Sequence, residues 1–264
     1  MALPLPSSPH WAPISTTAGI GSWFSSSMGT RQSPAGWLAG RGGWVGLAGA
    51  VGWDGWKGIG MASVQLDLRR LEPGHAPRPE DVAAAADAES VRVRGPVAGL
   101  AAVLTVLLKA ERTSLVPVAW EPAGDKASLS LARDIGVGTG EPRDLCLVRD
   151  DHGGVLLHHG RVQADGDGRR SLSRRLGLQA HHDDIKVADG EITRIDVRPD
   201  WRAVDTIGVT VMTLPLRPTR HTSGRALQIA SDPARILRDG VAYPRPVHRW
   251  TWYADDRVRW RLQP

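Results

Sequence analysis

The chain has no asparagine, few lysines and a single cysteine among its 264 residues. One cysteine excludes an intramolecular disulfide and a cysteine-based zinc site. Because Cys146 lies in the apolar run LCLV, we expect a buried thiol rather than a nucleophile. Phenylalanine and tyrosine are also scarce, with one and two residues beside eleven tryptophans. The preference for arginine over lysine is typical of GC-rich codons and carries little information about the fold.

The sequence also lacks a long apolar segment. Its longest apolar run, residues 96–108, is too short to cross a bilayer and fits a buried helix instead. The first residues, MALPLPSSPHW, lack the basic start and unbroken apolar stretch of a secretory signal. We therefore expect a cytoplasmic protein without a transmembrane segment, either free or peripheral to a membrane.

A net charge of +5 and a pI near 10 raise the question of an anionic partner. The arginines are scattered along the chain, and the densest cluster of them is short. A solvated arginine-rich surface explains this pattern better than a nucleic-acid interface. A weak attraction to an acidic membrane surface remains open.

Residues 1–61 differ in composition from the rest. They are rich in Ser, Pro, Gly and Trp and have neither helical nor strand periodicity. Glycine at this density makes ordering costly, so we expect a disordered extension, which a misassigned start codon upstream of Met61 would explain. The alternative is a tryptophan-bearing segment that contacts a partner or a membrane.

Residues 62–143 have the pattern of a short α/β segment. After a proline-rich link, EDVAAAADAE predicts a short helix and residues 90–94 predict a strand. The apolar run ending in VLTVLLKA predicts a buried helix, and residues 114–118 predict a buried strand of the parallel type. SLSLARDIGV predicts another helix, which stops at Gly136. Alternation of strand and helix is typical of an α/β sheet.

From residue 144 to residue 264 the pattern changes to short runs with alternating apolar positions. Asp-Gly pairs at residues 165–166, 189–190 and 239–240 separate several of these runs and predict tight turns. Such alternation is typical of half-buried antiparallel strands. We therefore predict a two-part α+β fold, in which the α/β segment is followed by an antiparallel β-sandwich-like domain.

Three stretches, in this order, resemble the bacterial diacylglycerol kinase family of lipid kinases. VRVRGPVAGLAAVLTVLL is similar to the family's strand, Gly-Gly-Asp-Gly-Thr turn and helix. TSLVPVAW with LSLARDIGVGTG is similar to the next strand, its Gly-Thr-x-Asn turn and helix, and GRALQIASDPARILRDGVAYPRPV to the closing hairpin with its Asp-Gly-Glu turn. The resemblance implies an ATP-binding α/β domain and a β-rich domain for the lipid. It also implies phosphoryl transfer from ATP, with Mg²⁺, to a lipid hydroxyl.

The resemblance places five candidate residues in these turns. Gly95 and Gly99 belong to the first, Gly124 and Asp125 to the second, and Asp239 to the third. Glycines in a phosphate turn let backbone amides approach the nucleotide, and a carboxylate there can hold Mg²⁺ or the attacking hydroxyl. We expect the four earlier residues to be vestiges of a nucleotide site. Asp239 is either the catalytic carboxylate or the ordinary first residue of a hairpin turn.

Each turn also departs from the family pattern. Pro96 takes the acidic position of the first turn and removes an amide donor, while Val241 replaces the glutamate of the third. The segment before residue 90 has room for about one helix, which is shorter than the family's opening units. We therefore predict a degenerate, N-terminally shortened member with weak or no kinase activity, using ATP and Mg²⁺ if active. The alternative is a non-catalytic lipid- or protein-binding module derived from the same fold.

Other motifs have simpler explanations. The histidine pairs at residues 158–159 and 181–182 match no metal-ligand spacing, and we expect exposed turn residues and no metal site. Trp250 and Trp252 alternate and so share one strand face. We expect them in the core or at a domain junction; a surface for an acyl chain is the alternative.

Overall fold

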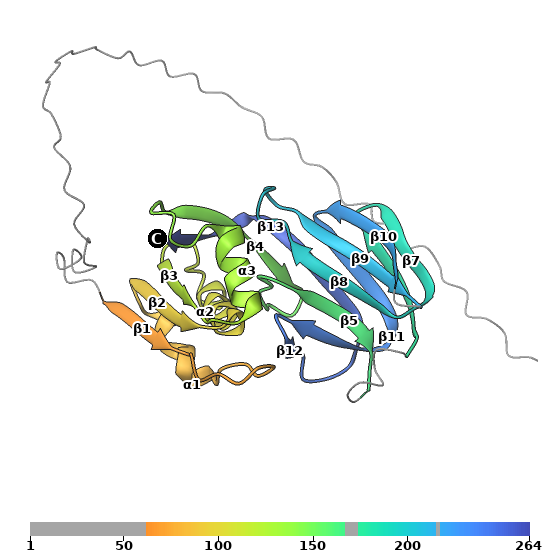
Figure 1. Ribbon diagram of the computed structural model, residues 1–264, viewed down its shortest axis with the longest axis horizontal. Helices are drawn as coiled ribbons and strands as arrows, with labels where there is room; N and C mark the ends of the chain where they lie inside the picture. Colours follow the sequence, from red (N-terminus) through yellow and green to blue (C-terminus); the bar gives the residue numbers. More distant parts are fainter. Residues whose placement is uncertain (1–61, 167–173, 215–216) are drawn as a thin grey trace, which may run out of the picture. The chain divides into compact units, whose positions relative to one another are not determined.

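The computed structural model describes residues 62–166, 174–214 and 217–264, which belong to one compact unit. The extension predicted for residues 1–61 lies outside these described residues. The fold is mixed α/β and dominated by one sheet, with all described helices on the N-terminal side of residue 136 (Figure 1). No helix in the described ranges is long and apolar enough to span a bilayer.

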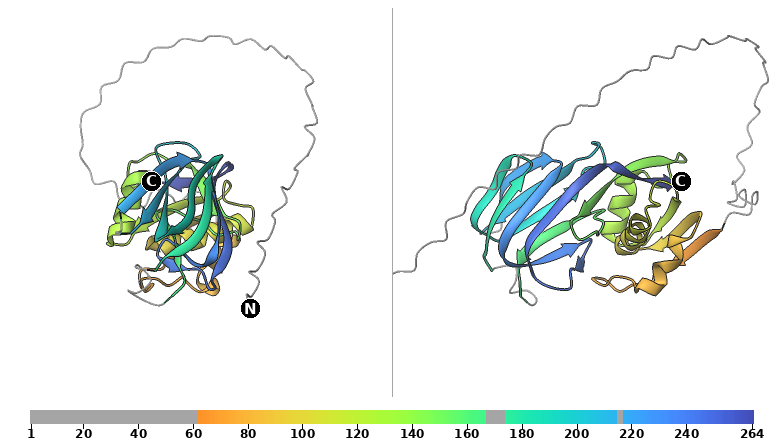
Figure 2. Two further views of the ribbon diagram at one scale, coloured as in Figure 1. Left: turned by 90° about the vertical axis from the view of Figure 1, so that its right-hand side faces the viewer. Right: turned by 180° about the vertical axis from the view of Figure 1, so that it is seen from behind.

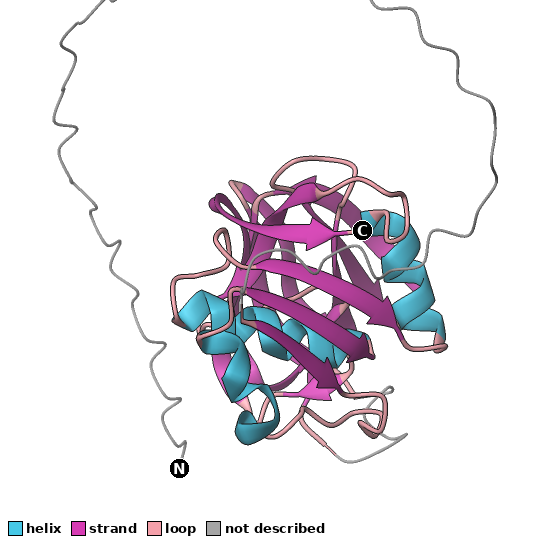
Figure 3. Cartoon of the chain, turned by 90° about the vertical axis from the view of Figure 1, so that its left-hand side faces the viewer, coloured by secondary structure: helices cyan, strands magenta, loops and turns pink. Residues whose placement is uncertain are grey.

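Three parallel strands form the α/β part, and the helices gather around them (Figure 3). Helix α2 follows from an Ala/Leu-rich run with seven buried residues, and α3 ends at Gly136, whose φ of 78° is the left-handed conformation that glycine adopts readily. Both helices were predicted. The elements are β1 (Ser63–Asp67), α1 (Pro79–Val82), the 3₁₀ helix η1 (Ala83–Ala86), β2 (Ser90–Gly95), α2 (Val97–Lys109), β3 (Pro117–Pro122) and α3 (Lys126–Ile135).

Two details of this part differ from the sequence prediction. The sequence indicated no strand before residue 80, yet β1 pairs with β2 along its whole length. β1 has one buried residue, Leu66, which is too few to produce a readable alternation. The next strand begins at Pro117 rather than at residue 114, because the amides of Leu115 and Val116 both bond back to the carbonyl of Arg112 and form a turn.

The β-rich part consists of antiparallel strands, as the alternating pattern predicted. Its long strands β11 and β13 run side by side (Figure 2). β11 pairs through its first half with β6 and through its second half with β5, so that two leaves of the sheet diverge from it. The strands are β4 (Arg143–Asp150), β5 (Gly160–Ala164), β6 (Leu176–His182), β7 (Ile185–Ile192), β8 (Arg194–Pro199), β9 (Ile207–Thr213), β10 (Arg217–Gly224), β11 (Ala226–Arg238), β12 (Val241–Ala242) and β13 (Val247–Gln263).

The apolar side chains form two clusters. One lies around α2 and the parallel strands and includes Leu104 and Trp260; the other lies between the two leaves and includes Trp250 and Trp252. These two indoles are buried in the core with their ring centres 5.7 Å apart. β13 pairs with β3, β4 and β11, so the sheet is continuous across residue 143, where the sequence suggested a domain boundary. That boundary stays a prediction.

The turn expected at Asp189-Gly190 is absent, and a turn that the sequence did not predict lies at residues 183–184. Asp189 and Gly190 lie within β7 and pair with β6, whereas the chain reverses at Asp183 and Asp184. Asp183 adopts a φ of 51° and its carboxylate accepts the amides of residues 225 and 226, so a long-range contact fixes this turn. An Asp-Gly pair marks a turn only where the pairing register also allows one.

Candidate functional site

The segments that follow the three parallel strands share one edge of the sheet. Gly95 ends β2, and Asp125 lies just beyond β3. The Asp239-Gly240 turn reaches this edge from the β-rich part: a Cβ placed on Gly74, after β1, would lie 3.8 Å from the carbonyl oxygen of Gly240. The fold therefore joins the first two expected turns and brings the third beside the segment that follows β1.

Charged side chains at this edge pair with one another. Arg94 at the end of β2 forms an ion pair with Glu121 at the end of β3 (Nε–Oε2, 2.7 Å). Arg69 bonds to Asp67 (2.6 Å), and these hydrogen bonds hold the pKa of the Asp67 carboxyl well below its ordinary value. The arginines closest to the strand ends thus already have carboxylate partners.

Gly95 and Gly99 allow close packing against the segment after β1. Gly95 has a φ of 149°, and a Cβ there would lie 2.9 Å from the backbone carbon and oxygen of Leu68. A Cβ on Gly99 would lie 3.0 Å from the Cδ1 atom of the same leucine. Gly95 is therefore required by the contact with the Leu68 backbone, whereas a Cβ on Gly99 would need only a small shift of the Leu68 side chain. Glycine has the same role where a backbone approaches a ligand.

The amides around the first turn are used within the protein. The Val97 N–H donates to the Oγ of Ser128 (3.3 Å), and the N–H groups of Gly99 and Leu100 donate to the carbonyl of Pro96. The Gly95 carbonyl accepts the indole N–H of Trp120 (3.0 Å). Pro96 itself has no N–H. Few donors remain here for a phosphate.

Asp125 caps α3. Its carboxylate accepts the backbone N–H of Ser128 (3.0 Å) and the hydroxyl of the same serine (2.5 Å). Ser128 is fully buried and also accepts the Val97 N–H, so one hydroxyl joins the starts of α2 and α3. Gly124, beside Asp125, faces open space, with nothing within 4 Å of an added Cβ. Asp125 therefore has the role of a helix N-cap.

Asp239 holds a loop of the β-rich part. Its carboxylate accepts the backbone N–H groups of Leu157 (2.9 Å), His158 (2.7 Å) and His159 (2.9 Å), while its own N–H donates to the His159 carbonyl. Burial raises the pKa of the Asp239 carboxyl, and the three N–H groups oppose that effect. Its φ of 48° fits a hairpin turn. Both carboxylate oxygens are engaged by the loop.

These contacts do not suit ATP with Mg²⁺. Phosphate binding needs free backbone amides or cations, and Mg²⁺ needs carboxylate oxygens that are not already committed. The amides and carboxylates of the three turns bond within the protein, and the described ranges contain no group of three or more acidic, histidine or cysteine side chains suited to a metal ion.

A charged network that the sequence did not reveal lies next to the Asp239 loop. Asp196 on β8 accepts hydrogen bonds from His159 (3.0 Å), Arg161 (2.8 Å) and Arg194 (2.8 Å). Burial opposes ionisation of Asp196, but its three partners outweigh it and hold its pKa well below the ordinary value. Asp196 faces Arg161 across the β5–β8 pair, so only the strand register could have indicated this network.

The sequence suggested that the histidine pairs are exposed turn residues, and this expectation is wrong. His182 lies on β6, is 1% exposed and bonds through Nδ1 to the Thr222 hydroxyl (2.7 Å). Burial lowers the pKa values of His158 and His182. His181 points to the other, partly exposed face, in agreement with the alternation of a strand.

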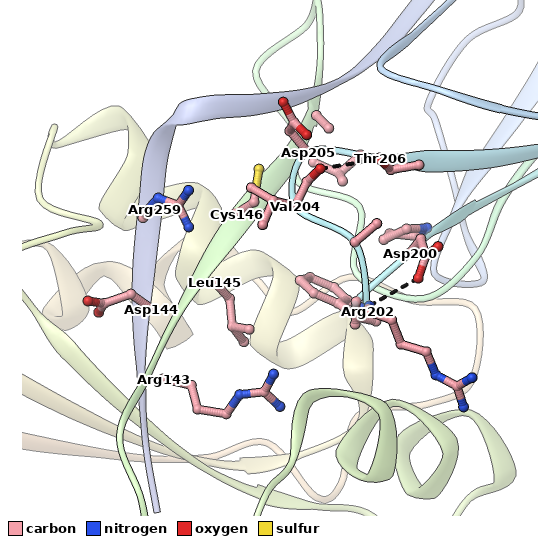
Figure 4. A pocket seen from close by; sticks show the side chains of 15 residues that line it. Arg143, Asp144, Leu145, Cys146, Asp200, Arg202, Val204, Asp205, Thr206 and Arg259 are labelled. Carbon is pink, nitrogen blue, oxygen red and sulfur yellow. Dashed lines mark hydrogen bonds between the residues drawn. The ribbon is translucent and has the colours of Figure 1, made fainter.

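A cavity of about 160 Å³ lies between β4 and the segment of residues 200–206 (Figure 4). Arg143, Asp144, Cys146 and Arg259 line it on the strand side. Burial raises the pKa of the Cys146 thiol, which donates to the carbonyl of Asp255. A thiol with a raised pKa is a poor nucleophile, so this cavity shows no sign of covalent chemistry.

Comparison with known proteins reveals similarity in structure and none in sequence. No known family profile and no curated protein matches the chain. A crystal structure named as a diacylglycerol kinase from Bacillus anthracis str. Sterne superposes with a TM-score of 0.56 at 10% identity, over 78% of this chain and 97% of that chain. Two further structures so named, from the same organism, give TM-scores of 0.54 at 9% identity and 0.56 at 11%; each covers 76% of this chain, and the match spans 96% and 97% of those chains. The chain therefore has the fold of diacylglycerol-kinase-like proteins.

Proposed function

We propose that the chain is a protein with a lipid-kinase fold that has lost phosphoryl transfer and acts as a non-catalytic binding module. The observation that supports this most directly is the bond network at the first two turns. The Ser128 hydroxyl accepts a hydrogen bond from the Val97 N–H, and the Asp125 carboxylate accepts hydrogen bonds from the N–H and the hydroxyl of Ser128.

Binding a nucleotide at these turns would require the network to break. Hydrogen bonds to a charged group contribute about 1.5–3 kcal/mol each, so releasing both Asp125 bonds would cost about 3–6 kcal/mol before any contact with phosphate forms. Ser128 is also fully buried, and its hydroxyl would lose its partners without reaching water. This cost would weaken nucleotide affinity by several orders of magnitude.

Thermal unfolding of the full chain with increasing ATP and MgCl₂ tests the proposal. A ligand at one hundred times its Kd stabilises the folded state by about 2.7 kcal/mol, which raises the Tm of a domain of this size by roughly 5–10 °C. We expect no shift at millimolar ATP. A saturable rise that requires both ATP and Mg²⁺ would refute the loss of the nucleotide site.

The second candidate is a weakly active lipid kinase, with ATP and Mg²⁺ as cofactors and a diacylglycerol-like lipid as substrate. The observation that favours it is the position of the Asp239-Gly240 turn beside the segment that follows β1. Transfer of labelled phosphate from ATP to lipid in mixed micelles tests it. D239N is the informative variant, and D150N is its matched control, because buried Asp150 also ties a turn through the amides of His152 and Gly154.

Genuine activity would disappear in D239N and persist in D150N. Equal activity in both variants would identify a contaminating kinase, and the absence of product in the unmodified chain would exclude the second candidate.

A further inference from the structure

A cavity of about 480 Å³ opens at the far end of α2 from the candidate turns. The 13-residue helix places it roughly 20 Å from Gly95, at 1.5 Å per residue. Its walls are the end of α2, the turn that follows, the end of β4 with its turn, and residues 257–259 of β13. Its volume falls within the range of about 300–1,000 Å³ that is usual for small-molecule sites.

A β-bulge in β13 builds one wall. Leu147 pairs with Asp255 and the preceding Cys146 pairs with Arg259, so residues 256–258 have no partner on β4 and project from the sheet. Val258 packs against the apolar cluster of the α/β part, and Asp255 accepts the Arg257 N–H (3.1 Å). These two contacts hold the bulge in place. Bulges commonly redirect side chains in this way.

The cavity wall is predominantly cationic. Lys109, Arg149, Arg257 and Arg259 line it, together with one acidic residue, Glu111. Arg149 is neutralised by Asp255 (2.6 Å) and lies over the Tyr253 ring (5.0 Å to its centre).

The other three cations form no ion pair with any residue of the described ranges; Lys109 and Arg257 are exposed, whereas Arg259 is half-buried and also lines the smaller cavity. Like charges that line one cavity repel one another, and a bound anion would offset that repulsion.

Helix α2 points its C-terminal end at the cavity, which is the negative end of its dipole. The carbonyls of its last turn are capped, because Ala110 donates to Val106, Arg112 to Leu107 and Glu111 to Leu108. Their effect on an anion is therefore reduced. The side chains, rather than the helix end, determine the sign of the potential in the cavity.

From this geometry we infer that the cavity binds a phosphate ester. The guanidinium group of Arg257 offers a planar pair of N–H donors suited to phosphate oxygens, Lys109 adds a point charge, and Arg259, which is shared with the smaller cavity, adds a further positive charge. Leu108 and Val258 give an apolar surface to the organic part of the ligand, and Thr113 and Ser114 add hydroxyl groups. The site is separate from the three turns and does not depend on their activity.

The phosphate can belong to a soluble ester or to a lipid headgroup. Leu115 follows Ser114 at the cavity wall and is 71% exposed, a position from which it could enter a bilayer. The shared chemistry is the phosphate group, and the two sources differ in whether Leu115 contributes.

Calorimetric titration of the full chain with glycerol 3-phosphate, and co-sedimentation with phosphatidylcholine vesicles with and without phosphatidic acid, test the inference. R257Q removes one cation from an exposed bulge, and R249Q is the matched control, since Arg249 is exposed on the same strand outside the cavity. We expect R257Q to weaken phosphate binding by about ten- to a hundredfold and R249Q to leave it unchanged.

Each result decides between the sources or against the site. Binding of glycerol 3-phosphate supports a soluble ester. Binding only to vesicles with phosphatidic acid, reduced by both R257Q and L115S, supports a lipid headgroup. The inference is overturned if neither probe binds, if R257Q and R249Q bind equally, or if a single-stranded oligonucleotide competes and binds more tightly than either phosphate.

Discussion

Replacement of Asp239 separates a structural carboxylate from a catalytic one. D239G keeps a backbone that tolerates the φ of 48° and removes the acceptor of three N–H groups. D239A removes the same acceptor and adds the cost of a positive φ, which is about 1–2 kcal/mol for a residue with a Cβ. The difference in stability between the two variants therefore measures the cost of the positive φ. The loss of stability in D239G alone measures the contribution of the carboxylate.

The structure sets the magnitude for D239G. A buried donor that loses its partner costs about 1–3 kcal/mol, so three of them give an upper bound of about 9 kcal/mol. Burial of the Asp239 charge reduces this bound, because it already offsets part of the gain, as the raised pKa of the carboxyl indicates. We expect D239G to lower the free energy of unfolding by about 3 kcal/mol, or the Tm by roughly 6–12 °C.

Chemical denaturation with fluorescence detection measures this change, with D183G as the control. Asp183 also has a positive φ and ties two amides, but it is exposed, so its replacement should cost much less. A D239G variant as stable as the unmodified chain would refute the structural role and leave catalysis as the reason for the carboxylate.

Three further outcomes follow from the contacts above. G95A should lower the free energy of unfolding by at least about 2 kcal/mol in urea titrations, because Gly95 has a positive φ and lies against Leu68. The control G124A should change it by less than about 1 kcal/mol. Equal effects of the two substitutions would contradict the packing role of Gly95. The Asp196 pKa is lowered in the folded state, so its contribution is present above the unfolded pKa of about 3.9 and is lost as the pH falls through the folded pKa; acid titration of D196N should lack this step. Burial lowers the His182 pKa, so the unfolded chain takes up the proton first and stability should decline as the pH falls below about 6.5; H182Q should show a shallower decline in Tm between pH 7 and pH 5, and an unchanged slope would count against it.

The sequence predicted the elements whose signals are local. The apolar period of α2, the glycine stop of α3 and the alternation of strands such as β9 are all contained in a few consecutive residues. The N-cap role of Asp125 belongs to the same class, since its partner Ser128 is three residues away, and an Asp before a helical run is a recognised signal.

What the sequence could not predict depends on distant partners. Asp239 bonds to amides about eighty residues earlier, and Asp196 meets Arg161 and His159 only through the β5–β8 register. β1 is an edge strand with a single buried side chain, so no alternation marks it. Likewise, the cationic cavity combines a helix end with a bulge on β13 far along the chain.

The position of β13 has a consequence for synthesis on the ribosome. Its last residues lie between β3 and β4, where Arg261 is opposite both Pro117 and Asp144. Until these residues leave the exit tunnel, β3 and β4 each present an edge without a partner, and the cluster around α2 lacks Trp260 and Leu262. The nascent α/β part therefore stays incompletely folded until β13 becomes available.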